Sequence, residues 1–429
     1  MQILKLAFRN VLRNKRRSLV SIFVLVIGVM GLGIFSGFMH FSFWGIQANI
    51  IHVGMGTPEG TGHFQVFDAR HLTADEPKFL EYGLADWQEL AKKIETIPEV
   101  AYAAPRMDIM GLLGNGEKSE PVIGFAIDPA KEKRLPGVFG SAEPYANLEK
   151  MPDGVILGRE LARTLNAQKT GYLTLVSTTT DGAMNAIDLQ FAGTINTGTP
   201  EGDRRFILVN LKSAMGLIQT DRVRKLAVVL KESGGTDRKH SGAEHSRNDY
   251  YKADMEKASL ALPALLDKEK YTVRSWRQLN SYYDAVTGIY STIFGFIGVV
   301  MAVVVILSIY NTMFMAVIER TREVGTLMAV GTPRRYILLL FLLEGMIIAL
   351  IGGILGYGGT YVMAGVISDA GLTMPPPPGG TQGYPLIIHT VHGWWISIVL
   401  FIMLNTVIAC FMPAYRAARM HIVKALYHV

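Results

Sequence analysis

Four stretches of the chain are long, apolar and almost free of charge, and a far more polar sequence separates the first from the second. A helix needs roughly 20 mostly apolar residues to cross a bilayer. The pattern therefore predicts an α-helical membrane protein with transmembrane helices at residues 18–46, 285–318, 336–367 and 393–414. Trp394 and Trp395 begin the fourth helix, as an interfacial aromatic anchor does.

Basic residues gather beside the ends of these helices. They are Lys5, Arg9, Arg13, Lys15, Arg16, Arg17, Arg320, Arg322, Arg334, Arg335, Arg416, Arg419 and Lys424. Segment 368–392 holds neither Lys nor Arg. Because Lys and Arg mark cytoplasmic segments, we expect three to be cytoplasmic: an amphipathic N-terminal helix (1–17), a connection (319–335) and the tail (415–429). Both termini would then be cytoplasmic, and segment 368–392 would be a short periplasmic loop.

The net charge of +6 comes from these flanking segments, because the rest of the chain is mildly acidic. A basic chain can indicate nucleic-acid binding, but this distribution reflects membrane orientation, so no nucleic-acid partner is expected. The single cysteine, Cys410, lies in an apolar run and leaves no internal disulfide possible.

Residues 47–284 form a long insertion between the first two spans, large enough for a folded domain. Gly62–Asp68 alternates as a strand does, and Asp86–Ile97 places its apolar residues on one helical face. A second group of short strands begins after Met151. We expect an α+β extracytoplasmic domain of two subdomains, with Glu232–Asp249 as an exposed polar loop.

Residues 271–285 contain neither Gly nor Pro, so the second span is expected to extend above the bilayer as a stiff stalk. Gly33 and Gly37, like Gly352 and Gly356, permit close helix packing. Packing within one chain and packing between two chains both remain open for these glycines.

Sequence motifs for enzymatic chemistry are absent. The chain contains no G-x-x-x-x-G-K-[ST] phosphate loop, no H-E-x-x-H, no C-x-x-C and no G-x-S-x-G. His63, Asp68 and His71 are close enough in sequence to suggest a metal site, but the simpler interpretation is that they are solvated side chains in a loop. We expect no enzymatic activity, no cofactor and no metal in this chain.

The connection ERTREVGTLMAVGTPRR (319–335) has Val324, Leu327 and Met328 on one helical face. Gly331 suits a helix C-terminus, and Thr332-Pro333 suits the start of the next helix. The pattern predicts a short amphipathic helix that turns directly into the third span. Either it is a plain interfacial helix, or it docks to a soluble partner.

This connection, with the Glu344-Gly345 pair that follows, resembles the signature of the FtsX-like permeases of ABC transporters, which include MacB, LolC and LolE. Ala7–Ser18 (AFRNVLRNKRRS) resembles the family's entry helix. Pro413–Leu426 resembles its closing motif, although Ile422 replaces the usual proline. The resemblance implies that residues 319–335 are a coupling helix for an ATPase. The residues concerned are Glu319, Arg320, Arg322, Glu323, Gly325, Leu327, Gly331, Pro333 and Arg334.

The resemblance also implies partners, location and mechanism. We expect a separate ATPase dimer that binds ATP and Mg, and a second permease chain, identical or paralogous, in the bacterial inner membrane. Membrane lipids and a periplasmic lipoprotein carrier are further expected partners. ATP hydrolysis would move the periplasmic domain through the first two spans, a mechanism termed mechanotransmission.

The cargo is the open part of this interpretation. Gly124–Glu132 (GFAIDPAKE) and the size of the insertion favour LolC and LolE, and hence lipoprotein release. A MacB-like exporter of antibiotics or peptides and an FtsX-like regulator of a periplasmic hydrolase are the alternatives. Candidates for a substrate cavity are Phe35, Phe38, Met39, Phe41 and Phe43, which can equally face lipid or pack internally.

The sequence does not assign a role to the Pro-rich loop 374–380 or to Glu344. The Pro-rich loop 374–380 differs from what we associate with LolC and LolE. Glu344 is the one acid inside a span, and the simpler expectation is that it pairs with an arginine near the interface.

Overall fold

The computed structural model of the protein describes residues 2–52, 60–72, 82–132, 143–233, 252–375, 383–421 and 425. Most of the polar loop expected at 232–249, and most of the Pro-rich loop expected at 374–380, lie outside these residues. The chain divides into two compact units. The helical unit comprises Met1–Ser42, Val286–Leu372 and Pro385–Val429, and the sheet unit comprises Phe43–Ala285 and Thr373–Tyr384.

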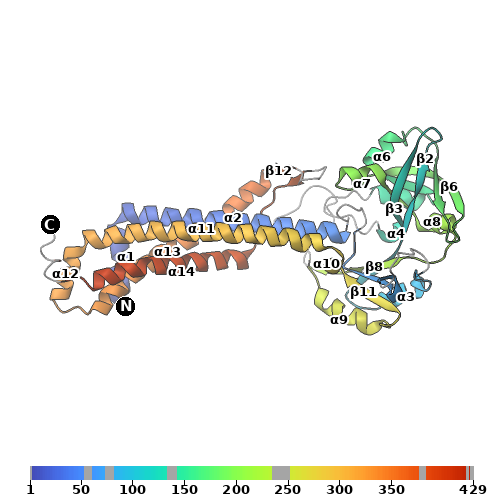
Figure 1. Ribbon diagram of the computed structural model, residues 1–429. Coiled ribbons are helices and arrows are strands. Elements are labelled where there is room, and N and C mark those ends of the chain that lie inside the picture. The colour runs from blue at the N-terminus through green and yellow to red at the C-terminus, as the bar shows by residue number, and fades with distance from the viewer. Residues whose placement is uncertain are drawn as a thin grey trace. The chain divides into compact units, whose positions relative to one another are not determined.

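The helical unit is built from six helices of the described chain, four of them long (Figure 1). They are α1 (Gln2–Arg13), α2 (Lys15–His52), α11 (Ser281–Glu319), α12 (Thr321–Ala329), α13 (Arg334–Asp369) and α14 (His392–Ala418). Helices α2, α11, α13 and α14 are long and apolar enough to cross a membrane. This confirms the four predicted helices, and α2 runs six residues beyond the expected end at residue 46.

A common apolar core joins the four long helices. Leu25 of α2, Ile309 of α11, Ile348 of α13 and Ile402 of α14 are buried in one cluster, which also includes Val11 of α1. Glycines bring α2 and α13 together, because a Cβ atom at Gly356 would lie 2.6 Å from the Cβ atom of Val29. The close-packing glycines therefore serve packing within this chain.

The sheet unit is an α+β fold, as predicted (Figure 1). Its strands in the main sheet are β1 (Phe64–Asp68), β2 (Val100–Gly114), β3 (Ser119–Ile127), β4 (Gly154–Gly158), β5 (Leu173–Thr178), β6 (Met184–Ile195), β7 (Phe206–Asn210), β8 (Lys225–Leu230) and β11 (Tyr271–Ser275). The short strands are β9 (Glu232–Ser233), β10 (Lys252–Ala253), β12 (Thr373–Met374) and β13 (Tyr384–Pro385).

Short helices complete this unit. They are η1 (Ala69–Leu72), α3 (Trp87–Ile94), α4 (Pro129–Glu132), α5 (Glu143–Lys150), α6 (Arg159–Thr164), α7 (Pro200–Arg205), α8 (Leu211–Ile218), α9 (Met255–Leu265) and α10 (Trp276–Leu279). Leu90 and Ile94 of α3 are buried in the main apolar core, as the amphipathic pattern predicted.

The nine strands have the order β11-β1-β8-β2-β3-β7-β4-β6-β5, and β2 also pairs with β5. The strands from β2 to β5 therefore close into a ring, while β8, β1 and β11 extend from the other end of β2. Strand β2 serves both parts, pairing with β8 through its first half and with β3 through its second. The strands of the two expected subdomains therefore belong to one sheet, joined through β2, and the structure has one compact sheet unit rather than two.

The stalk expected over 271–285 begins later than predicted. Tyr271–Ser275 is strand β11, which pairs with β1, and Trp276–Leu279 is the separate helix α10. Helix α11 starts only at Ser281. Inside the sheet unit, the end of α2 is fixed by hydrogen bonds from the Thr61 and Gly62 amides to the Ile50 and Ile51 carbonyls, and Trp276 packs against both isoleucines.

Candidate functional site: a charged network at α12

Helix α12 is amphipathic, and its apolar side is buried. Val324 and Met328 lie in a cluster with Val317 of α11, Ile337 of α13 and Ala414 of α14. The helix ends in a Schellman motif, because Thr332 donates its amide to the Leu327 carbonyl and Gly331 to that of Met328. Gly331 has φ +97°, a conformation that favours glycine.

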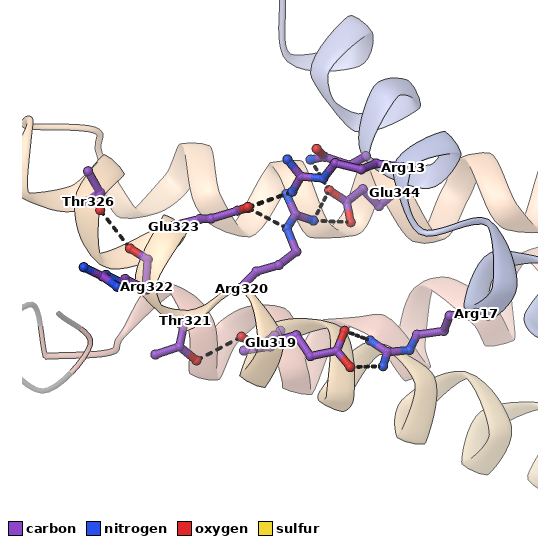
Figure 2. Close-up of polar contacts among 11 residues, drawn as sticks. Arg13, Arg17, Glu319, Arg320, Thr321, Arg322, Glu323, Thr326 and Glu344 are labelled. Carbon is purple, nitrogen blue, oxygen red and sulfur yellow. Dashed lines mark hydrogen bonds and ion pairs between the residues drawn. The ribbon is translucent and has the colours of Figure 1, made fainter. Parts of the chain in front are cut away.

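A buried ion pair joins this turn to the third span. Nη1 of Arg320 lies 2.8 Å and 3.0 Å from the two carboxylate oxygens of Glu344 (Figure 2). Asn10 of α1 donates to the same carboxylate at 2.6 Å. All three residues are at least 92% buried. The expected pairing of Glu344 with an arginine is confirmed, and Asn10 is an additional partner.

Two further ion pairs, both at the surface, join the N-terminal segment to residues 319–323. Arg13 of α1 places Nη2 2.9 Å and 2.8 Å from the carboxylate oxygens of Glu323 (Figure 2). Arg17 of α2 makes a two-fold contact with Glu319, the last residue of α11. The network thus links α1, α2, α11, α12 and α13.

Charge keeps Glu323 and Arg320 ionised. Burial alone would raise the pKa of Glu323, but hydrogen bonds from Arg13 and Arg320 outweigh it and hold that pKa below its usual value. Burial would lower the pKa of Arg320, and the charge and hydrogen bonds of Glu344 raise it instead. Arg320 also lies 5.5 Å from the centre of the Phe341 ring, a cation–π contact.

The residues expected to contact an ATPase are divided by this arrangement. Glu319, Arg320 and Glu323 form ion pairs within the chain, Gly325 is buried and Leu327 is half-buried. Glu319 and Glu323 are half exposed despite these ion pairs. The other exposed members are Arg322, Gly331, Pro333 and Arg334, and they are joined by Thr326 and by Val330, which is 83% exposed. Sequence reasoning missed the contacts of Asn10, Arg13 and Arg17, because it interprets their segment as an orientation signal and an amphipathic entry helix without naming partners for these side chains.

The five residues expected to line a substrate cavity pack against their own chain or are at least half-buried in it. Phe35 stacks on Phe294 of α11 with ring centres 5.4 Å apart, and Phe38 packs in the cluster of Ile388 and Trp395. Met39 and Phe41 are buried, and Phe43 is half-buried. These contacts agree with the alternative that the five side chains pack internally. A substrate cavity that they would form with a second permease chain stays a prediction.

The prediction of solvated side chains is wrong for His63 and Asp68, which are buried and have structural partners. The His63 ring accepts a hydrogen bond from the Leu230 amide at 3.1 Å, and Arg70 forms an ion pair with Asp68 at 2.8 Å. Within the described part of the chain, no three His, Cys, Asp or Glu side chains gather as metal ligands would.

Comparison with known proteins finds similarity in the helical part of the chain. Residues 295–422, from within α11 to the C-terminal segment, match the family described as FtsX-like permease C-terminal. This range includes segment 319–335 and Glu344.

Three curated relatives extend the match. The ABC transporter permease YknZ of Bacillus subtilis is 31% identical over 50% of this chain and 52% of its own. The macrolide export ATP-binding/permease protein MacB of Wolinella succinogenes is 23% identical over 99% of this chain and 60% of its own. LolC, a lipoprotein-releasing system transmembrane protein of Xylella fastidiosa, is 22% identical over 80% of this chain and 81% of its own. The chain thus spans about half the length of YknZ and somewhat more of that MacB.

Proposed function

We propose that this chain, which carries an FtsX-like permease domain in residues 295–422, is the membrane subunit of an ABC transporter driven by a separate ATPase subunit. The observation that carries the proposal is the division of segment 319–335 into two sides. Its inner side is fixed to the chain by the buried Arg320, and its outer side presents Arg322, Val330 and Arg334 as well as the ion-paired Glu323. A rigid element with an exposed tip suits transmission of a partner's movement.

The long helices give this movement a path. Helix α2 is continuous from Lys15 to His52, and α11 from Ser281 to Glu319. Each spans roughly 57 Å at 1.5 Å per residue. Arg17 and Glu319 pair at one end of these helices. In our proposal, ATP-driven displacement of α12 shifts this end and moves the sheet unit on the periplasmic side.

For the cargo, we propose lipid-anchored proteins released from the inner membrane towards a periplasmic carrier. The support is the match with LolC, which extends over 80% of this chain. The match with MacB extends over 99% of this chain, so export of an antibiotic or peptide is the second candidate.

The ATPase interface is tested by purifying the chain together with its cognate ATPase subunit. Val330→Asp and Arg334→Glu, both at exposed positions, are expected to abolish co-purification, because they place negative charge at the docking surface. Lys212→Glu reverses a charge at an exposed position of the sheet unit and should leave co-purification unchanged. Retention of the ATPase by both α12 variants would contradict the proposed docking surface.

The cargo is tested with the intact complex in nanodiscs. We expect lipid-anchored proteins to co-purify with it and to stimulate its ATP hydrolysis several-fold. The same proteins without their acyl chains are the control and should have no effect. Stimulation by a macrolide or peptide, with no response to lipoproteins, would favour the second candidate.

A further inference from the structure

Helix α1 has two apolar faces, and only one is covered. Asn10 and Val11 are buried, in contact with the long helices. Leu4, Phe8 and Leu12 recur at every fourth position and are 54%, 49% and 50% exposed. At 100° per residue these three side chains form one stripe, beside the buried face. An exposed apolar stripe of this kind requires an explanation in a helix that already packs against its own chain.

Basic residues border the stripe. Lys5 and Arg9 follow it around the helix, and both are exposed. No acid occurs between Gln2 and Ser18. In the described part of the chain, Arg13 and Arg17 form ion pairs, whereas no acidic group lies within 4.0 Å of Lys5 or Arg9. Of the six cations of this segment, Arg13 and Arg17 form the ion pairs that Figure 2 shows, whereas Lys5, Arg9, Lys15 and Arg16 are exposed.

The depth of α1 follows from its partner. Asn10 reaches Glu344, which lies ten residues into the membrane-crossing helix α13. That is roughly 15 Å along the helix from Arg334. Exposed Leu19, Phe23 and Ile27 continue the apolar surface along α2, itself a candidate span. The stripe of α1 is therefore followed along the chain by an exposed apolar surface of a candidate span.

We propose that the outer face of α1 is a binding surface for anionic phospholipid, with Leu4, Phe8 and Leu12 among the acyl chains and Lys5 and Arg9 on the headgroup phosphates. An apolar face flanked by cations is the arrangement that holds interfacial helices on negatively charged membranes. The proposal does not depend on the cargo or on the ATPase. It assigns Lys5 and Arg9 to lipid, and Asn10 and Arg13 to the internal network.

The single buried cysteine makes a direct test possible. In a Cys410→Ala background, Phe8→Cys is labelled with bimane and the protein is placed in phosphatidylcholine nanodiscs. Brominated phosphatidylglycerol or brominated phosphatidylcholine is then added at equal mole fraction. We expect phosphatidylglycerol to be enriched around the label roughly five-fold, the gain from about one cation at a membrane surface, and to quench correspondingly more.

Three further variants serve as controls. Lys5→Gln with Arg9→Gln should reduce the quenching preference to parity, and Arg322→Gln with Arg334→Gln, at exposed positions near α12, should leave it unchanged. A label at Phe23→Cys, on the exposed side of α2, should be quenched equally by both lipids. Equal quenching of the Phe8 label by both lipids would overturn the anionic selectivity. Absence of quenching at Phe8, with quenching at Phe23, would show that water or another protein covers the stripe.

Discussion

Arg13 and Arg320 both pair with glutamates of this network, yet their surroundings differ. The Arg13 and Glu323 side chains are each about half exposed, whereas those of Arg320 and Glu344 are nearly buried. An exposed ion pair contributes at most about 1 kcal/mol. Removing one partner of a buried pair costs roughly 3–5 kcal/mol, because the other charge is left without compensation. The two arginines should therefore respond very differently to substitution.

We predict that Glu344→Leu strongly lowers the thermal stability of the purified protein, and that the double variant Arg320→Met/Glu344→Leu recovers most of the loss. Apolar side chains that replace both charges leave no unpaired ion. Thermal unfolding in detergent measures the effect, and Arg13→Ala, which affects only the exposed pair, should shift the midpoint little. A double variant no more stable than Glu344→Leu would contradict the balance of charges described here.

The sequence predicted the presence of this site better than its contacts. Charge placement and the Gly331 turn predicted α12, and an acid in a span predicted an arginine partner. It could not identify Asn10 as a ligand of Glu344, because the two are 334 residues apart. Only the packing of α1 against α13 brings these two residues together. Local sequence patterns carry no signal for a contact between residues so far apart in the chain.

At the scale of elements, local periodicity predicted the four long helices, and the errors arose where a distant partner determines the structure. Residues Tyr271–Ser275 contain no helix breaker, yet they form β11 because β1, about 200 residues earlier, offers a strand edge. Pairing across such a separation overrides helix propensity. For the same reason the sequence could not decide whether the glycines of α2 and α13 pack within one chain or between two chains, because their neighbours are distant in sequence.

Helix α13 provides a matched pair of glycines. A Cβ atom at Gly356 would lie 2.6 Å from the Cβ atom of Val29, whereas a Cβ atom at Gly358 would meet no atom of the described residues within 4 Å, apart from its own helix backbone. We predict that Gly356→Ala forces α13 away from α2 and destabilises the protein by about 1–3 kcal/mol, the usual cost of overpacking. Gly358→Ala should not lower stability. Thermal unfolding in detergent compares the two, and equal behaviour would contradict the close approach of α2 and α13.

At the scale of the whole molecule, orientation in the membrane rests on charge. Lys and Arg are retained on the cytoplasmic side of a span. In this chain they flank α2, α12 and the end of α14, while the sequence between α13 and α14 has none from 368 to 392. From this distribution we propose that α12 is cytoplasmic and that the sheet unit is not.

We therefore predict opposite accessibility for two exposed positions, Met184 of the sheet unit and Val330 beside α12. In a Cys410→Ala background, Met184→Cys should react with a membrane-impermeant maleimide added to spheroplasts, because the reagent reaches the periplasmic side. Val330→Cys should react only after the membrane is lysed. Both positions are highly exposed, at 77% and 83%, so folding does not limit either reaction. The reverse pattern would place α12 outside the cytoplasm, where no ATP-driven subunit could dock, and would contradict the proposed function at its base.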